Sequence, residues 1–312
     1  MRLAIIDCGT NTFNLLIAEL FENKEGFSVV HNEKKSVKLG EGGLNNGKIA
    51  PKPFQRGLDV FESFVKTARQ MEVQSVKAFA TSAIRSSTNG PDFVKSVHHK
   101  TGVMIQVING DTEAQYIYKG VNLALNQFAS SALIMDIGGG STEFIIAQNN
   151  KVVWKRSFDL GAARLLELLK PANPLTNEQK TNLIQIFDEL LSPLTEKMKE
   201  VEIDTLIGCS GSFESVSDMI LHFKDSKITS GAPVVLLDNN DFEVVYNELI
   251  NSTEAERRNM PGLVHFRVDT IVFAILFINY IKNLFGINQM YYSSYSLKEG
   301  VLADIMLQNI AV

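Results

Sequence analysis

Residues 132–146, Ala-Leu-Ile-Met-Asp-Ile-Gly-Gly-Gly-Ser-Thr-Glu-Phe-Ile-Ile, restrict the fold more than any other stretch, because three consecutive glycines separate two apolar runs. The apolar runs predict two buried strands, and the glycines predict the tight turn of a hairpin. Gly138, Gly139 and Gly140 lack a Cβ, so their backbone N–H groups can turn towards an anion, and Ser141 adds a hydroxyl donor. The stretch therefore predicts a phosphate-binding hairpin.

Two acidic residues flank this glycine turn. Asp136 ends the first strand, and Glu143 follows the turn. Because both carboxylates would repel a bare phosphate, we interpret them as ligands of a divalent cation that also contacts phosphate oxygens. The alternative is an ordinary glycine-rich turn with two solvated acids.

The N-terminus repeats this design. Residues 2–17 again run from an apolar strand through Asp7, Gly9 and the polar residues Thr10 and Asn11 into a second apolar strand. Two copies of one pattern suggest two related half-molecules. We therefore predict a two-lobed α/β structure, with Asp7 and Asp136 facing each other across one cleft.

The composition limits the choice of partners. The chain has 312 residues, enough for two domains that each bury a core. A formal net charge of −5 argues against a general nucleic-acid binder. A polyanionic ligand must therefore meet a locally positive channel, for which Arg85, Arg164, Arg267 and Lys298 are the candidates. Arg164 has the equally good alternative of a solvated surface residue.

Several sequence features indicate a cytoplasmic protein without a membrane contact. Cys8 and Cys209 are the only cysteines, which favours a reducing compartment. The N-terminus shows no secretory signal pattern. The most apolar run, residues 268–281, contains Asp269 and is shorter than the roughly 20 residues of a membrane span, so we expect a core helix.

Apolar periodicity and turn residues predict the order of the remaining elements. We expect strands at residues 3–7, 13–20, 27–38, 76–80, 103–108, 151–158, 205–208 and 289–292. We expect helices at residues 51–71, 91–100, 112–129, 176–200, 240–250, 253–259, 264–284 and 298–308, and two further helices that begin at 161–164 and at 211–212. Residues 22–26 are expected to form a polar turn, and residues 125–131 a linker between the halves.

Polar side chains at the carboxyl ends of two strands are candidate site residues, because an α/β sheet usually binds its ligand there. Arg85 follows the strand at 76–80 and could grip a phosphate with two N–H groups, or it could be a surface arginine. Glu113 lies in the first turn of a helix that Asp111 or Thr112 can cap. An acid there often only complements the helix dipole. Its place one strand before the phosphate hairpin favours a functional role.

A third glycine-containing turn follows the strand at 205–208. Gly208, Ser210, Gly211 and Ser212 connect this strand to a helix. The helix N-terminus offers backbone N–H groups to an anion. Small residues would also suit a purely structural strand–helix connection.

Six motifs together resemble the exopolyphosphatase / guanosine pentaphosphate phosphohydrolase family, the Ppx/GppA phosphatases. In chain order they are Asp7-Cys-Gly-Thr-Asn-Thr12, Thr81-Ser-Ala-Ile-Arg85, Gly110-Asp-Thr-Glu113-Ala, Asp136-Ile-Gly-Gly-Gly-Ser-Thr-Glu143, Gly208-Cys-Ser-Gly-Ser212 and Leu297-Lys-Glu-Gly-Val301. The resemblance spans essentially the whole chain and corresponds to the short form of the family. One departure follows Arg267-Val-Asp269, where the family's usual proline and glycine are missing.

The resemblance implies a fold and a domain division. It implies two ribonuclease-H-like domains, as in the superfamily of actins, sugar kinases and heat-shock chaperones, with a cleft between them. We expect the domains to span residues 1–125 and 126–297, with a terminal helix over 298–312 that packs back on the first domain.

The resemblance also implies an activity, the removal of terminal phosphates from inorganic polyphosphate with Mg²⁺. It makes Glu113 the catalytic carboxylate, Asp136 and Glu143 the metal-site acids, and Arg85 a phosphate-binding residue. The other positions expected to contact substrate are Asp7, Gly9, Thr10, Asn11, Gly138, Gly139, Gly140, Ser141, Gly208, Ser210, Gly211, Ser212, Arg267 and Lys298.

Two other functions stay open. Guanosine pentaphosphate presents the same terminal phosphoanhydride as polyphosphate, so its hydrolysis is the nearest alternative activity. The alternative that is not an enzyme is a protein that binds ATP to switch conformation, as a chaperone or a filament subunit does. A second copy of this chain is a candidate partner in each case.

Overall fold

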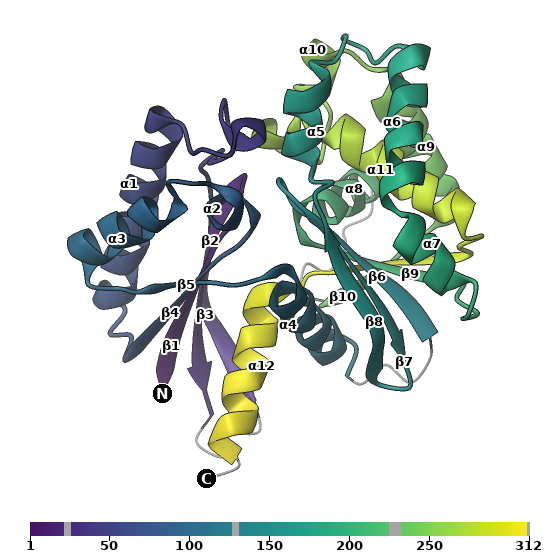
Figure 1. Cartoon of the computed structure of the whole chain (residues 1–312). Coiled ribbons are helices and arrows are strands. Elements are labelled where there is room, and N and C mark those ends of the chain that lie inside the picture. Colours follow the sequence, from purple (N-terminus) through teal and green to yellow (C-terminus); the bar gives the residue numbers. More distant parts are fainter. Residues whose placement is uncertain (22–25, 127–130, 225–231, 311–312) are drawn as a thin grey trace. The chain divides into compact units, whose positions relative to one another are not determined.

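The computed structural model describes residues 1–21, 26–126, 131–224 and 232–310 (Figure 1). Contacts between residues divide the chain into two compact units. The first unit comprises Met1–Gly120 and Ser296–Val312, and the second comprises Val121–Tyr295. Most of the turn expected at residues 22–26 and the centre of the linker expected at 125–131 lie outside the described residues.

The first unit contains one five-stranded sheet in the order β3-β2-β1-β4-β5. Its strands are β1 (Arg2–Cys8), β2 (Thr12–Leu20), β3 (Phe27–Ser36), β4 (Ser75–Ala80) and β5 (Ile105–Val107). Strands β1, β2 and β3 form an antiparallel meander, whereas β4 and β5 run parallel to β1. The carboxyl ends of β1, β4 and β5 therefore lie at one edge of the sheet.

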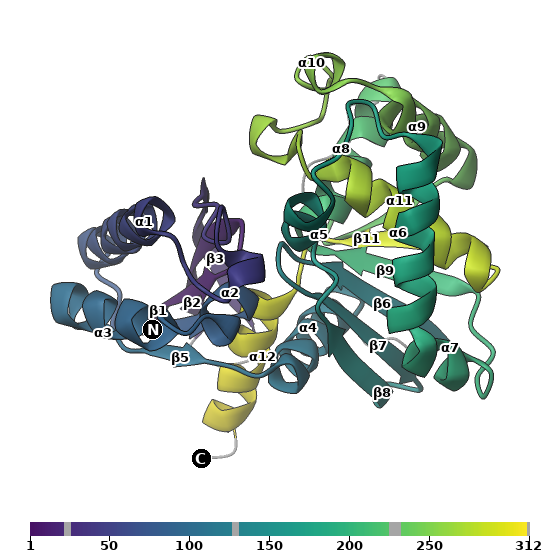
Figure 2. The same cartoon turned by 45° about the horizontal axis from the view of Figure 1, so that its top comes forward.

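Helices cover both faces of this sheet. They are α1 (Pro51–Gln70), α2 (Ser82–Ser86), α3 (Gly90–Thr101), α4 (Gly110–Ala124) and α12 (Leu297–Ile310), with a short 3₁₀ helix at Leu44–Asn46. Alternate residues of β1 point to opposite faces. Ala4 and Ile6 join the core under α1 and α3, while the terminal helix α12, yellow in Figures 1 and 2, packs near β1 on the other side.

The second unit contains a six-stranded sheet in the order β10-β11-β9-β6-β7-β8. Its strands are β6 (Ser131–Ile137), β7 (Thr142–Gln148), β8 (Lys151–Phe158), β9 (Thr205–Cys209), β10 (Val234–Leu237) and β11 (Gln289–Ser293). A meander of β6, β7 and β8 is again followed by two strands, β9 and β11, that continue the sheet parallel to β6. This repeated order confirms the predicted fold class of two ribonuclease-H-like halves. Strand β10, an edge strand of four residues, was not predicted.

Helices of the second unit pack against α11, whose residues 271–278 and 281 are buried. The helices of this unit are α5 (Ala162–Leu169), α6 (Asn177–Leu190), α7 (Ser192–Met198), α8 (Ser210–Phe223), α9 (Asn239–Asn251), α10 (Glu254–Arg257) and α11 (Ile271–Leu284), with a 3₁₀ turn, η2, at His265–Arg267. The expected core helix at residues 268–281 is thus confirmed. Within the described ranges, no helix combines the length and apolarity that a membrane span requires.

Three helix predictions need correction. The single helix expected over 176–200 is two helices, because Pro193 at the start of α7 has no N–H to continue the ladder of α6. The helix expected from 264 begins only at Ile271, after η2. Helix α4 was expected to run to about 129 but ends at Ala124. Its start is capped by Asn109, whose Oδ1 accepts from the Thr112 N–H at 2.8 Å, and not by Asp111 or Thr112.

Candidate functional site

The glycine turn between β6 and β7 is fixed from one side by the start of α5. The carbonyl of Gly138 accepts from the backbone N–H of Ala162 at 3.0 Å, and the carbonyl of Gly139 accepts from the backbone N–H of Arg164 at 3.0 Å. The carbonyl of Gly140 accepts from Nε of Arg164 at 2.8 Å. These bonds direct the three carbonyls to α5 and leave the N–H groups of the turn for another partner.

The N–H groups of this turn are available to a ligand, as the predicted phosphate-binding hairpin requires. The Gly138 N–H closes the turn by donating to the Ser141 carbonyl at 3.0 Å. The N–H groups of Gly139, Gly140 and Ser141 have no hydrogen-bond partner among the residues that the structure describes. Gly140 and Ser141 are buried, and a buried N–H without a partner is costly. A row of such groups is a typical concave site for an anion.

Asp136 and Glu143 lie directly opposite each other in the β6–β7 ladder. Opposite residues of an antiparallel pair share one face, with Cβ atoms about 4.5–5.5 Å apart. Both side chains are buried, with exposed fractions of 6% for Asp136 and 1% for Glu143. Two acids so close in a buried position favour a cation between or beside them, because like charges opposite each other are destabilising.

Each acid of this pair is oriented by a serine. Ser210 Oγ donates to Asp136 Oδ2 at 2.7 Å, and Ser157 Oγ donates to Glu143 Oε1 at 2.6 Å. These hydrogen bonds fix the orientation of the two carboxylates.

The donor set fits Mg²⁺ better than a metal held entirely by protein. In the described part of the chain, no group of three or more His, Cys, Asp or Glu side chains converges on a common metal position. A structural zinc site would need four such ligands. Mg²⁺ commonly takes one or two carboxylates and completes its coordination with waters and substrate phosphates, which matches Asp136 and Glu143.

The start of α8 brings a third turn to Asp136. Strand β9 ends at Cys209, and Ser210 follows with φ +61°, a left-handed conformation that residues other than glycine rarely adopt. This conformation carries the Ser210 hydroxyl to Asp136, while Ser212 Oγ donates to the Ile137 carbonyl at 3.4 Å. The turn at 208–212 therefore supports the end of β6.

Arg267 stabilises the same turn through hydrogen bonds and an ion pair. It donates to the carbonyl of Gly211 and to Ser215 Oγ, the latter at 2.9 Å, and it pairs with Glu214 at 3.1 Å. A Cβ on Gly211 would lie 1.9 Å from Arg267 Nη2, so the close approach requires glycine. Burial lowers the pKa of Arg267, and the charge of Glu214 acts against this shift. In the structure Arg267 thus supports the first turn of α8, and its expected contact with substrate stays a prediction.

The turn between β1 and β2 repeats the geometry of the glycine turn in the second unit. The Gly9 N–H donates to the Thr12 carbonyl at 3.1 Å. The carbonyls of Thr10 and Asn11 accept N–H groups from residues 37–40 at 2.7 to 3.3 Å. The N–H groups of Thr10 and Asn11 have no hydrogen-bond partner within the described ranges.

The acid of this turn has a different neighbour from its counterpart. Asn14 lies opposite Asp7 in the β1–β2 ladder, and its Nδ2 donates to Asp7 Oδ2 at 3.1 Å. The corresponding ladder position in the second unit is Glu143. Of the two related turns, the one in the second unit therefore carries the acid pair that suits a metal.

Arg85 and Glu113 meet at the carboxyl edge of the first sheet. Arg85 lies in α2 after β4, and Glu113 lies in the first turn of α4 after β5. Arg85 Nη1 is 2.7 Å from Glu113 Oε2 and donates to the Ile108 carbonyl at 3.1 Å. The exposed fractions of the side chains are 23% for Arg85 and 9% for Glu113. The contact holds the carboxylate in place and leaves other N–H groups of Arg85 available.

The remaining expected site residues lie in varied surroundings. Arg164 Nη2 pairs with Asp159 at 3.1 Å. Lys298 Nζ is 3.8 Å from Glu299 Oε1 in α12. Gly208 lies inside β9, where a Cβ would overlap an aromatic ring of α8. Its role in the fold is therefore close packing.

Each of the four cations expected to line a positive channel has a carboxylate neighbour in its own unit. Their contribution to a local positive potential is therefore smaller than their number indicates.

The sequence reasoning also missed Asn14 and Ser157, which orient Asp7 and Glu143. Asn14 could have been found by counting ladder positions outward from its glycine turn, whereas a register shift between Ile146 and Ala147 hides Ser157 from such counting.

The fold agrees with comparisons to known proteins. A crystal structure of an exopolyphosphatase from Cytophaga hutchinsonii is similar, with a TM-score of 0.95 and 35% identity over 99% of this chain and 98% of that chain. The bifunctional 3-dehydroquinate synthase/phosphatase of Fusobacterium nucleatum is 29% identical over 91% of this chain. The guanosine-5'-triphosphate,3'-diphosphate pyrophosphatase of Vibrio atlanticus is 24% identical over 97% of this chain.

The chain spans 43% of the Fusobacterium relative and 59% of the Vibrio relative, less than two thirds of each. The model of the Ppx/GppA phosphatase family matches residues 16–309. This protein therefore belongs to the Ppx/GppA phosphatase family.

Proposed function

We propose that this protein is an exopolyphosphatase that hydrolyses the terminal phosphoanhydride bond of inorganic polyphosphate, releases orthophosphate and uses Mg²⁺. The observation that carries the proposal is the row of unpartnered N–H groups at residues 139–141 next to the buried pair Asp136 and Glu143. An anion site beside a cation site suits a phosphoryl group accompanied by a metal. The similarity to the Cytophaga exopolyphosphatase favours polyphosphate as the substrate.

The second unit would bind the transferring phosphoryl group. The free N–H groups of the glycine turn donate to its oxygens, while Asp136 and Glu143 hold Mg²⁺, each oriented by its serine. When bound, Mg²⁺ neutralises charge on the phosphates and acidifies water. The N–H groups stabilise charge on the phosphoryl oxygens without reorganising, because α5 already fixes the turn.

The first unit would supply the base and a clamp for the same reaction. Glu113 takes a proton from the water that attacks phosphorus, while the P–O bond to the penultimate phosphate breaks. Arg85 keeps the Glu113 carboxylate oriented and binds a phosphoryl oxygen with its other N–H groups. The N–H groups of Thr10 and Asn11 would bind a further phosphate.

Hydrolysis of guanosine pentaphosphate is the second candidate activity. It is favoured by the similarity to the Vibrio guanosine-5'-triphosphate,3'-diphosphate pyrophosphatase. The proposed base, metal acids and N–H groups would act identically on its terminal phosphoanhydride. The two activities therefore differ in how the rest of the substrate is held.

Phosphate release from long polyphosphate, guanosine pentaphosphate and ATP, measured in parallel with and without Mg²⁺, tests the proposal. We expect the highest kcat/KM for polyphosphate and loss of turnover when the metal is chelated. A higher kcat/KM for guanosine pentaphosphate would replace the proposal with the second candidate. ATP binding without hydrolysis of any of the three compounds would favour a nucleotide-dependent switch.

A further inference from the structure

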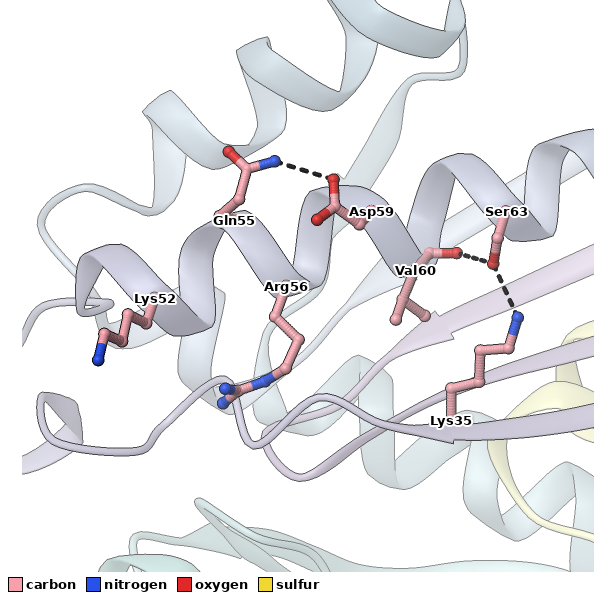
Figure 3. Close-up of a pocket in the computed structure, with 7 residues that line it drawn as sticks. All are labelled: Lys35, Lys52, Gln55, Arg56, Asp59, Val60 and Ser63. Atoms are coloured by element: carbon pink, nitrogen blue, oxygen red, sulfur yellow. Dashed lines mark hydrogen bonds between the residues drawn. The ribbon is translucent and has the colours of Figure 1, made fainter.

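A basic hollow lies between α1 and the end of β3, within the first unit (Figure 3). Its volume is about 480 Å³. Three cations, one acid and three neutral side chains line it: Lys35, Lys52, Gln55, Arg56, Asp59, Val60 and Ser63. None of these residues takes part in the site described above.

Two of the cations are already positioned by the protein. Lys35 Nζ donates to Ser63 Oγ at 2.9 Å and lies 5.2 Å from the ring centre of Phe64. Its ion pair with Glu33 has an N···O distance of 3.0 Å. Both members of that pair are about one third exposed, so the pair contributes little and a multivalent anion can compete for the ammonium group.

Arg56 connects the hollow to the phosphate turn of the first unit. Its guanidinium donates to the carbonyls of Val37 and Lys38, the latter at 3.1 Å. The N–H groups of these two residues both donate to the Asn11 carbonyl at 2.8 Å. The backbone at residues 37–38 therefore lies between Arg56 and the turn at Thr10 and Asn11. The N–H groups of that turn are unpartnered in the described structure.

The hydrogen-bond capacity of Arg56 is not exhausted by these contacts. Its Nε and Nη2 make the carbonyl contacts, and Nη2 also pairs with the exposed Glu41 at 2.7 Å. No contact among the described residues uses Nη1. This nitrogen offers two N–H groups to a ligand in the hollow.

Lys52 supplies the uncompensated charge of the hollow. It is exposed, and it has no hydrogen bond or ion pair with any described residue. The single acid of the lining, Asp59, accepts from Gln55 Nε2 at 2.8 Å and lies 3.4 Å from Lys100 Nζ. Lys100 is shared with Glu62, whose Oε2 lies 2.8 Å from Lys100 Nζ. Among the lining residues themselves three cations stand against one acid, so the lining favours an anion.

We propose that this hollow binds phosphate groups of polyphosphate that are remote from the bond being hydrolysed. The inference rests on the proposed exopolyphosphatase function and extends it to the recognition of long chains. A polyphosphate chain carries a charge at every unit, so a second cluster of cations near the first phosphate turn adds affinity through multivalency. Tripolyphosphate and guanosine pentaphosphate carry only three consecutive phosphates, so we expect the hollow to add less to their binding than to the binding of a long chain. The hollow would therefore favour long chains over both of these compounds.

Charge substitutions of opposite sign test this inference. Lys52→Glu should weaken equilibrium binding of long polyphosphate by about three- to tenfold, as expected when two charge units change at an exposed contact. Asp59→Asn should strengthen binding by about two- to threefold, because it removes the one acid and keeps its acceptor oxygen. Lys95→Glu is the matched control, an exposed lysine of α3 that does not line the hollow.

The substrate comparison separates this site from the proposed function itself. For tripolyphosphate, kcat/KM should be unchanged in all three variants. Thermal melting should show that Lys52→Glu is folded, because an acid in the first turn of α1 complements the helix dipole. Equal effects of Lys52→Glu and Lys95→Glu on the binding of long polyphosphate, or an equal loss for tripolyphosphate, would overturn the proposal. If wild-type protein neither binds nor hydrolyses polyphosphate, the proposed function fails and the hollow has no such role.

Discussion

The substitution Glu113→Gln gives the sharpest test of the proposed chemistry. Glutamine keeps the size of the side chain and an acceptor oxygen for Arg85, but it cannot take a proton from water. Loss of a general base typically lowers the rate by about 10²–10⁴-fold. At about 1.4 kcal/mol per factor of ten, this corresponds to roughly 2.7–5.4 kcal/mol in the activation barrier.

The structure predicts a smaller effect of this substitution on folding stability. The 2.7 Å contact between Arg85 and Glu113 joins two charged groups, and such a hydrogen bond contributes about 1.5–3 kcal/mol. Glutamine retains part of this contact, and Arg85 also keeps the Ile108 carbonyl. We therefore expect a loss of roughly 1–2 kcal/mol, well below the 5–15 kcal/mol stability of an ordinary domain.

Three measurements distinguish the two effects: steady-state phosphate release, equilibrium binding of polyphosphate and thermal melting. Glu113→Gln should lose turnover while binding stays close to wild type, whereas Arg85→Ala should weaken both, since a clamp acts in ground and transition states alike. Asp111→Asn is the control, because Asp111 is an exposed acid in the same helical turn. If Glu113→Gln retains more than about a tenth of wild-type turnover, Glu113 is not the base and Asp136 or Glu143 becomes the better candidate.

Three other changes test the supporting contacts. Ser210→Ala removes the 2.7 Å hydrogen bond to Asp136 and should raise the Mg²⁺ concentration for half-maximal activity about 10- to 100-fold; an unchanged Mg²⁺ titration contradicts this role. Gly211→Ala places a Cβ 1.9 Å from Arg267 Nη2 and should lower the free energy of unfolding by roughly 1–3 kcal/mol; a melting temperature equal to wild type would show that Arg267 moves aside freely. Burial, and to a smaller extent the nearby carboxylates, raises the pKa of Tyr292. The neutral Tyr292 side chain therefore contributes to stability below the unfolded tyrosine pKa of about 10, and this contribution is lost as pH rises above it. Denaturant unfolding between pH 8 and about 11 should show this loss in wild type and a smaller one in Tyr292→Phe, and identical slopes would refute it.

The amino-acid sequence predicts the local features of both sites well. The glycine turns, their flanking strands and the acids Asp136 and Glu143 follow from residue types that are adjacent in the chain. The register of a tight hairpin then places these two acids opposite each other, without any information from distant residues. The break between α6 and α7 had a local signal as well, in Pro193, which the apolar periodicity of residues 176–200 outweighed in the prediction.

Contacts between distant residues were decided by the tertiary structure. Ser210 reaches Asp136 across 74 positions because β9 pairs parallel to β6, and no spacing rule specifies which strands become neighbours. Gly161 shows the same dependence, since a Cβ there would lie 2.3 Å from the carbonyl carbon of Gly139 and prevent α5 from closing on the turn. The contacts of Arg267 with Gly211 and Ser215 likewise join residues more than 50 positions apart. Residue types along the chain determine which groups can bind phosphate and metal, whereas the order of strands and the packing of helices determine which of them remain free to do so.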